Sequence, residues 1–183
     1  MNFLLKEPSI SFAEQIERQA SSISSTLLLP EPGSNNFSFR LSRFPVDGTE
    51  TILDIHSSGS RYFITVTRFL VSIRNIMNHS TGHNEFNNAK LPIEISISEC
   101  PCNEPILSEI NNTSIFDLAS SLSPKKDTDH FFIFFTDSHN CICSGISDPF
   151  GKDDEQWIRI LNRSYGSALI PPRRSLANFS LLE

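Results

Sequence analysis

Five apolar residues run without interruption from Phe131 to Phe135, inside the stretch DHFFIFFTDSHNCIC. If this run is a strand, its side chains alternate between two faces. One face receives Phe131, Ile133 and Phe135, and the other receives Phe132 and Phe134. Burying each of these side chains is worth on the order of 1.5–3 kcal/mol, which is too much to leave either face in water. The chain must therefore fold so that this strand is covered on both sides.

Four further segments have the residue pattern of antiparallel strands. The segments FSFRLSRF, ETILDIHSS and SRYFITVT follow one another after residue 36, and a Ser-Ser-Gly-Ser turn separates the last two. The fourth segment, LPIEISIS, alternates apolar Leu91, Ile93, Ile95 and Ile97 with polar residues and has Pro92 near its start. This alternation predicts a half-buried strand.

Two segments predict helices that would cover one face of this sheet. The segment KDDEQWIRILNRSYG begins with acidic residues and carries an apolar stripe of Trp157, Ile158, Leu161 and Tyr165. The segment NTSIFDLASSLS predicts a short helix over 115–122, which Pro124 ends. The segment at 67–77, TRFLVSIRNIM, fits a strand or a helix, and its spacing is somewhat closer to a helix.

The order of these elements predicts an α+β fold with a single domain. We expect a mostly antiparallel sheet of about five to six strands, packed with two or three helices over residues 36–166. An N-terminal extension, 1–35, carries a short amphipathic helix, with a capping-box pair at Ser11 and Glu14, before a Pro/Gly-rich linker. The C-terminal residues 167–183 contain two prolines and are expected to form a flexible tail.

Charge and hydropathy argue against two classes of partner. Fifteen basic residues against 21 acidic ones give a net charge of −6. The basic residues are scattered, whereas a nucleic-acid binder clusters its cations against phosphates. The apolar runs are too short for a signal peptide or a membrane span. We therefore expect no nucleic acid and no membrane, and a location in the cytoplasm or the nucleus.

The cysteines raise the possibility of a metal site. Cys100 and Cys102 form one C-x-C pair, Cys141 and Cys143 form another, and His139 is a spare ligand. Residues two apart on an extended chain point the same way, so two such pairs have the ligand types for zinc. Zinc knuckles usually have C-x2-C spacing, however, and Pro101 removes a backbone donor. A zinc-binding protein is therefore kept as an alternative, and the favoured expectation is no metal.

Neither of two enzyme patterns is complete. A cysteine hydrolase needs an imidazole within reach of its thiol, but His139 is too near Cys141 in sequence to turn back towards it on an extended chain. The segment GISDPFGK resembles a phosphate-binding loop, yet it has five residues between its glycines and Asp153 after its lysine, where a repulsive carboxylate would meet phosphate. It is predicted to be the turn before the last helix. We expect no enzyme and no cofactor.

The order of the motifs resembles the fourth proteasome assembly chaperone family. The segments that carry the resemblance are NFSFRL, SRYFITVT, KLPIEISI, IFDLASSLSPKKDTDHFFIFFTDSHN and DDEQWIRIL, over about residues 36–165. The positions that match the family best are Phe63, Val66, Pro92, Leu118, Ala119, Leu122 and Phe134. The chain differs from the family by a longer N-terminal extension, a Pro-rich tail and an insertion around 98–113.

The resemblance implies a non-catalytic subunit that forms a heterodimer with a sister, the third proteasome assembly chaperone. It also implies that the pair docks at the alpha-5 region of the forming 20S proteasome alpha ring and leaves before the particle is complete. We expect Phe132 and Phe134 to contribute to the partner-binding surface. An interaction subunit of another intracellular complex is the main alternative.

Overall fold

A computed structural model describes residues 38–75, 89–100, 104–113, 115–118, 128–136, 141–151, 154–167 and 173–179. They form one antiparallel sheet with the strand order β6-β5-β1-β2-β3-β4-β7. The strands are β1 (Ser38–Phe44), β2 (Thr51–Ser58), β3 (Arg61–Phe69), β4 (Ala89–Cys100), β5 (His130–Thr136), β6 (Cys141–Ser147) and β7 (Arg173–Phe179). The helical elements are α3 (Pro105–Asn112), η1 (Ile115–Asp117), η2 (Pro149–Gly151) and α4 (Glu155–Ser167).

The strands β1 to β4 confirm the segments that alternation predicted. Strands β2 and β3 form a hairpin in which Ser58 pairs with Arg61, so Gly59 and Ser60 make a two-residue loop. Gly59 has a φ of 63°, a left-handed conformation that a residue without a Cβ adopts readily. Strand β3 then pairs with β4 over the length of both segments.

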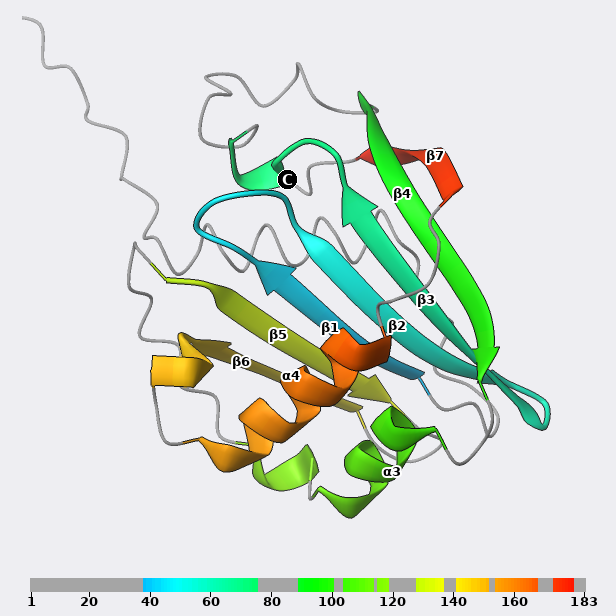
Figure 1. Ribbon diagram of the computed structural model, residues 1–183, viewed down its shortest axis with the longest axis vertical. Helices are drawn as coiled ribbons and strands as arrows, with labels where there is room; N and C mark the ends of the chain where they lie inside the picture. The colour runs from blue at the N-terminus through cyan, green and yellow to red at the C-terminus, as the bar shows by residue number, and fades with distance from the viewer. Residues whose placement is uncertain are drawn as a thin grey trace, which may run out of the picture.

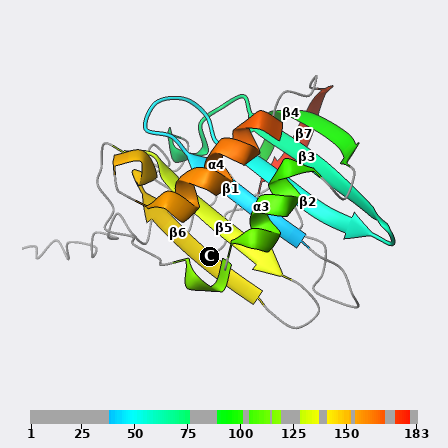
Figure 2. The same ribbon diagram turned by 60° about the horizontal axis from the view of Figure 1, so that its bottom comes forward.

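The apolar run at 131–135 forms most of β5, an interior strand between β1 and β6. In register, Phe135, Ile133 and Phe131 lie opposite Phe39, Leu41 and Arg43 of β1. Partners that lie directly opposite in an antiparallel pair share a face of the sheet. Figures 1 and 2 show α3 and α4 together on one face, which we call the helix face. The other is called the opposite face.

The hydrophobic core fills the space between the helix face and these helices. Its largest member is Trp157 of α4, which is fully buried. The predicted strand orientation is confirmed, because the same cluster contains one side chain from every second position of β5. The core members from β5 and α4 are Phe131, Ile133, Phe135, Trp157, Ile160 and Leu161.

Helix α4 was predicted, whereas α3 was not. The sequence predicts an insertion around residues 98–113, but eight of these residues form α3, with Pro105 in its first turn and no side-chain cap. The buried residues Ile106, Leu107 and Ile110 bind it to the core, and Arg159 of α4 pairs with its Glu109 at 3.1 Å. The helix expected at 115–122 begins as the short turn η1, and the residues after Leu118 in that range lie outside the described residues.

The ambiguous segment at 67–77 contains both structures in turn. Strand β3 continues through Phe69, and the residues 73–75 are helical. The buried carboxylate of Glu50 accepts hydrogen bonds from the backbone N–H groups of Ile73 at 2.8 Å and Arg74 at 2.9 Å. Glu50 therefore satisfies the unbonded donors at the start of this helical turn and fixes it beside β2.

The C-terminal part of the chain corrects the expected boundary of the sheet. Residues Arg173–Phe179 belong to the segment expected as a tail, but they pair with β4 as the edge strand β7. Figure 1 shows β7 alongside β4, at the far side of the sheet from β6. The α+β class and the antiparallel sheet are thus confirmed, and the described sheet extends beyond residue 166.

The segment predicted as a turn before the last helix forms the end of β6, Asp148 and η2. Asp148 has a φ of 51°, and its side chain accepts a hydrogen bond from the backbone N–H of Gly151. A Cβ at Gly151 would collide with a carboxylate oxygen of Asp148, so a larger residue there would require the Asp148 side chain to move. In the described part of the chain, no helix has the length and apolar character to cross a membrane.

We expect Glu50→Ala to lower the free energy of unfolding by about 2–4 kcal/mol, because it removes a buried charged acceptor from two backbone donors. Urea denaturation followed by circular dichroism measures this change. Asp47→Ala, which removes an exposed carboxylate in the preceding loop, is the control and should stay within about 0.5 kcal/mol of wild type. Equal effects of the two substitutions would contradict the role given to Glu50.

Candidate partner-binding surface

Phe132 and Phe134 both lie on the opposite face of the sheet, as predicted from alternation. Phe132 is 8% exposed, and its ring packs edge-on against Phe44 with the centroids 5.5 Å apart. Its burial therefore needs no second chain. Phe134 is only partly buried. Partner binding by these two residues stays a prediction, and Phe134 is the more accessible of the pair.

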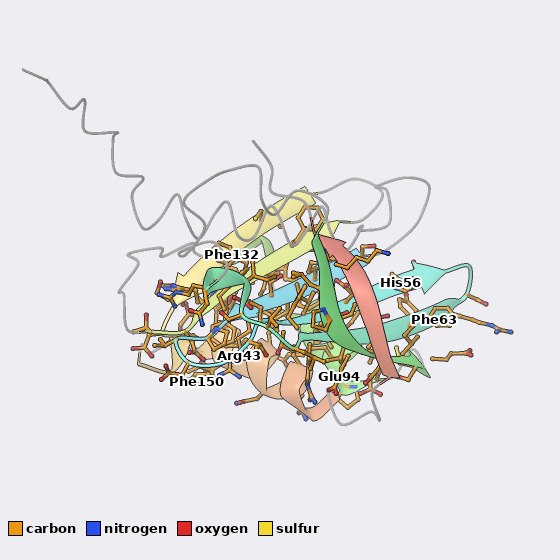
Figure 3. All side chains as sticks on the ribbon, turned by 90° about the horizontal axis from the view of Figure 1, so that it is seen from above. Arg43, His56, Phe63, Glu94, Phe132 and Phe150 are labelled. Atoms are coloured by element: carbon orange, nitrogen blue, oxygen red, sulfur yellow. The ribbon has the colours of Figure 1, made fainter. Side chains whose placement is uncertain are left out.

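The opposite face has a buried part and a more exposed part. The buried part follows the strand ends that contain Phe44, Ile52 and Phe69, all of which are fully buried. Figure 3 shows Phe132 towards this end of the sheet and His56 and Phe63 towards the other. The apolar members of the buried part are Phe44, Ile52, Phe69, Leu91, Ile93 and Phe132. These side chains stand beside one another on the same face of the sheet, and Phe132 of β5 is buried among them.

A buried ion pair separates the two parts. Arg40 of β1 is opposite Asp54 of β2, and its guanidinium donates two hydrogen bonds to the carboxylate, at 2.6 and 2.9 Å. Only 2% of the Arg40 side chain is exposed. Its third nitrogen, Nη1, is buried without a hydrogen-bond partner among the described residues. Two-point pairing fixes the geometry of both side chains, since a guanidinium and a carboxylate present matching pairs of atoms.

The exposed part contains a group that we call the Ile97 patch, formed by the apolar residues Phe63, Ile95 and Ile97 together with His56 and Thr65. Ile97 is 64% exposed and lies opposite Thr65, while the other members are partly buried. His56 and Phe63 are cross-strand partners, and their rings stack with the centroids 5.5 Å apart. The apolar members lie on the adjacent strands β3 and β4, and the His56 ring of β2 lies beside them.

Ile97 lies past the end of the described pairing between β4 and β7. This pairing ends at Ile95 and Arg173. The alternation in LPIEISIS correctly predicts that Ile97 shares a face with Leu91 and Ile93, but those two are buried and Ile97 is not. Alternation gives the face of a residue and carries no information on how far the neighbouring strand extends.

The four cysteines do not form one zinc site. Cys100 is on β4 and Cys143 is on β6, and four strands lie between β4 and β6. At about 4.8 Å per strand, the two residues are about 24 Å apart, whereas ligands of one zinc ion lie within a few Å of each other. They also point to different faces, because Cys100 belongs to the core and Cys143 is opposite Phe134. Cys102 and His139 are outside the described residues.

The two described thiols differ in environment. Burial raises the pKa of the Cys100 thiol, and the nearby Glu104 carboxylate raises it further. Cys143 is exposed. The described residues contain no group of three His, Cys, Asp or Glu side chains suited to hold a metal ion.

One histidine lies within hydrogen-bond distance of a hydroxyl nucleophile. His130 Nδ1 is 2.7 Å from Ser147 Oγ, and the two residues are partners across β5 and β6. This spacing matches a nucleophile and base, but both residues are almost completely buried. A substrate has no access to that pair, and we assign it to the packing of the sheet.

Alkylation should distinguish the two thiols. With iodoacetamide at about pH 8, we expect Cys143 to react at least roughly tenfold faster than Cys100, because only the exposed thiolate is available. Mass spectrometry of the digested peptides measures both rates, and unfolding in urea should make them similar. Equal rates in the folded protein would contradict these positions.

Asp54→Asn should lower the free energy of unfolding by about 3–5 kcal/mol, because it leaves the buried Arg40 guanidinium without its counter-charge. Glu99→Gln is the matched control, since it breaks an exposed pair with Arg61 at 3.7 Å and should cost less than about 1 kcal/mol. The double substitution Arg40→Met with Asp54→Leu should recover most of the loss. Chemical denaturation of the variants tests all three expectations, and equal losses from Asp54→Asn and Glu99→Gln would refute them.

Comparison with known proteins finds no family model, no curated protein and no solved structure that matches this chain. The resemblance to the fourth proteasome assembly chaperones therefore stays a prediction from sequence.

Proposed function

We propose that this chain is a non-catalytic chaperone subunit that binds a sister chaperone through the opposite face of its sheet and promotes assembly of the 20S proteasome alpha ring. The observation that carries the proposal is the Ile97 patch, in which a large aliphatic side chain is 64% exposed among partly buried apolar neighbours. Contiguous exposed apolar surface is typical of protein-binding sites, and Ile97 with Phe63 and Ile95 provides such a surface across β3 and β4.

A sheet surface is well suited to bind a second sheet. Two sheets pack face to face about 10 Å apart, and side chains from both inner faces interdigitate. A stable interface buries roughly 800 Å² on each partner, so it needs more than Ile97 alone. Phe134 shares its cross-strand row with Arg40, Asp54, Thr65 and Ile97. The buried pair Arg40–Asp54 lies between Ile97 and Phe134 in this row, so these two residues would contact a partner at separate points.

The choice of the proteasome alpha ring depends on the order of motifs. SRYFITVT contributes most of β3, KLPIEISI forms the middle of β4, and DDEQWIRIL leads into α4, so these motifs coincide with elements of the sheet and its helix cover. The net charge of −6 favours a client surface that is basic. A cytoplasmic or nuclear location belongs to the same proposal.

Affinity purification of the full chain from its native cells tests the partner. We expect one other small protein and proteasome alpha subunits, including alpha-5, without beta subunits. Capture of a different complex would replace the proteasome assignment by the broader one, an interaction subunit of another assembly.

Ile97→Asp tests the surface itself. A charge at the centre of an apolar interface should weaken pairing by at least about 2 kcal/mol, or roughly 30-fold. The stability of the isolated chain should change little, since Ile97 is largely exposed in it. Titration calorimetry with the purified partner measures the affinity, and circular dichroism checks folding.

The matched control is Asn162→Asp, which adds the same charge at an exposed site on α4. It should leave the affinity for the partner unchanged. If Ile97→Asp binds as tightly as this control, the Ile97 patch is not the partner surface. Phe134→Asp provides a second position on the same row, and its retained pairing would limit the surface to β2–β4.

A further inference from the structure

A second feature lies on the helix face, away from the proposed partner surface. A cavity of about 160 Å³ opens between the sheet and the C-terminal half of α4. Its floor consists of Leu41, Leu53 and Val66, which are cross-strand neighbours on β1, β2 and β3. Phe131 closes one side, and this ring is fully buried. The interior of the cavity is therefore predominantly apolar.

The cavity forms where an apolar cross-strand row of the sheet is followed by a row of polar and charged side chains. The apolar floor row is followed by a row of Arg43, Thr51 and Arg68, whose longer or polar side chains stand at the rim. Ser164 of α4 forms the roof, and its hydroxyl donates a hydrogen bond to the Ile160 carbonyl. A small serine in the roof leaves space that a larger apolar residue would fill.

The size of the cavity limits what it can hold. An apolar cavity of about 150 Å³ accommodates a molecule the size of benzene. A single phenyl ring or a branched aliphatic group therefore fits, and a larger ligand does not. A polar group attached to the phenyl ring or aliphatic group of the ligand would lie beside the charged residues at the rim.

The two arginines at the rim have different partners. Arg43 donates to Asp129 from both Nε and Nη2, at 3.0 and 2.6 Å, so its charge is already compensated. Arg68 is exposed and lies opposite Glu94 of β4. Figure 3 shows Arg43 and Glu94 on the side of the sheet that carries α4. Glu94 is therefore the carboxylate directly across the strand pair from Arg68, and it also lies opposite Arg174 of β7.

We propose that this cavity binds a small apolar carboxylate, with its phenyl or branched aliphatic group on the floor of Leu41, Leu53 and Val66 and its carboxylate at Arg68. The apolar part gains by leaving water, and a guanidinium matches a carboxylate with two parallel hydrogen bonds. The ligand is either a free acid or the C-terminal residue of a peptide, since both present the same groups. This site is independent of pairing through the Ile97 patch.

Titration of the full chain with benzoate tests the site. In two-dimensional NMR, we expect shifts of amides around Leu53 and Val66, with a dissociation constant of roughly 1 mM, as befits so small a ligand. Benzyl alcohol, which keeps the ring and lacks the charge, should bind about tenfold more weakly. Equal binding of both compounds, or binding of neither, overturns the proposal.

Substitutions at the rim test separately how the charge of Arg68 and the fit of the ring contribute to binding. Arg68→Gln should weaken benzoate binding about tenfold and leave benzyl alcohol unaffected. Glu94→Gln should strengthen benzoate binding severalfold, because it removes the competing carboxylate, and a merely structural role of Glu94 would not produce this gain. Arg61→Gln is the control, since it removes an exposed arginine from the same strand on the opposite face. If Arg61→Gln weakens binding as much as Arg68→Gln, the effect is general electrostatics and the assigned contact is wrong.

Binding measurements with two peptides distinguish a free acid from a peptide C-terminus as the natural ligand. A tripeptide that ends in phenylalanine with its carboxylate intact is compared with the same peptide ending in an amide. Tighter binding of the acid peptide than of benzoate assigns the site to a chain terminus. Binding of benzoate with no binding of either peptide assigns it to a free acid.

Discussion

The fold depends on burying β5, whose apolar side chains project from both faces of the sheet. Because β5 is apolar at five consecutive positions, it has to lie inside the sheet, and each of its faces has to meet a separate apolar layer. On the helix face, Trp157 and its neighbours from α4 provide that layer. On the opposite face, Phe44 meets Phe132 within the same chain. The requirement that first indicates a partner is thus met in part by the chain itself, and the partner proposal rests on the Ile97 patch instead.

On the opposite face, apolar packing and a buried ion pair lie in neighbouring cross-strand rows. Its buried part is apolar, whereas Arg40 and Asp54 place a desolvated ion pair in the next cross-strand row. Such a pair adds little net stability compared with well-packed apolar residues, because both charges lose their hydration. Its geometry is nevertheless demanding, since a one-residue shift between β1 and β2 would put the two charges on different faces. We infer that the pair selects the register of the central hairpin more than it stabilises the sheet.

Sequence patterns predicted the strands better than the surfaces. Alternation identified β1 to β4 and the two faces of β5, and the apolar stripe of Trp157 and Leu161 identified α4. The pattern missed α3 because that helix is short and lacks a side-chain cap; its detectable signals were Pro105 at the start and the apolar residues of its first and second turns. Strand β7 and the exposure of Ile97 could not be predicted from local sequence for another reason. Both depend on which distant segment pairs with β4, and local periodicity does not contain that information.

The C-terminal end of β4, residues 97–100, affects how copies of this chain would interact with one another. Beyond the last described pair with β7, residues 97–100 have no strand partner on their outer edge among the described residues, and the exposed side chain of Ile97 lies on this stretch. Edges of this kind template unwanted strand addition between identical molecules. The charged neighbours Glu99 and Arg61 oppose such stacking only weakly. An edge of this kind favours self-association of the chain as its concentration rises.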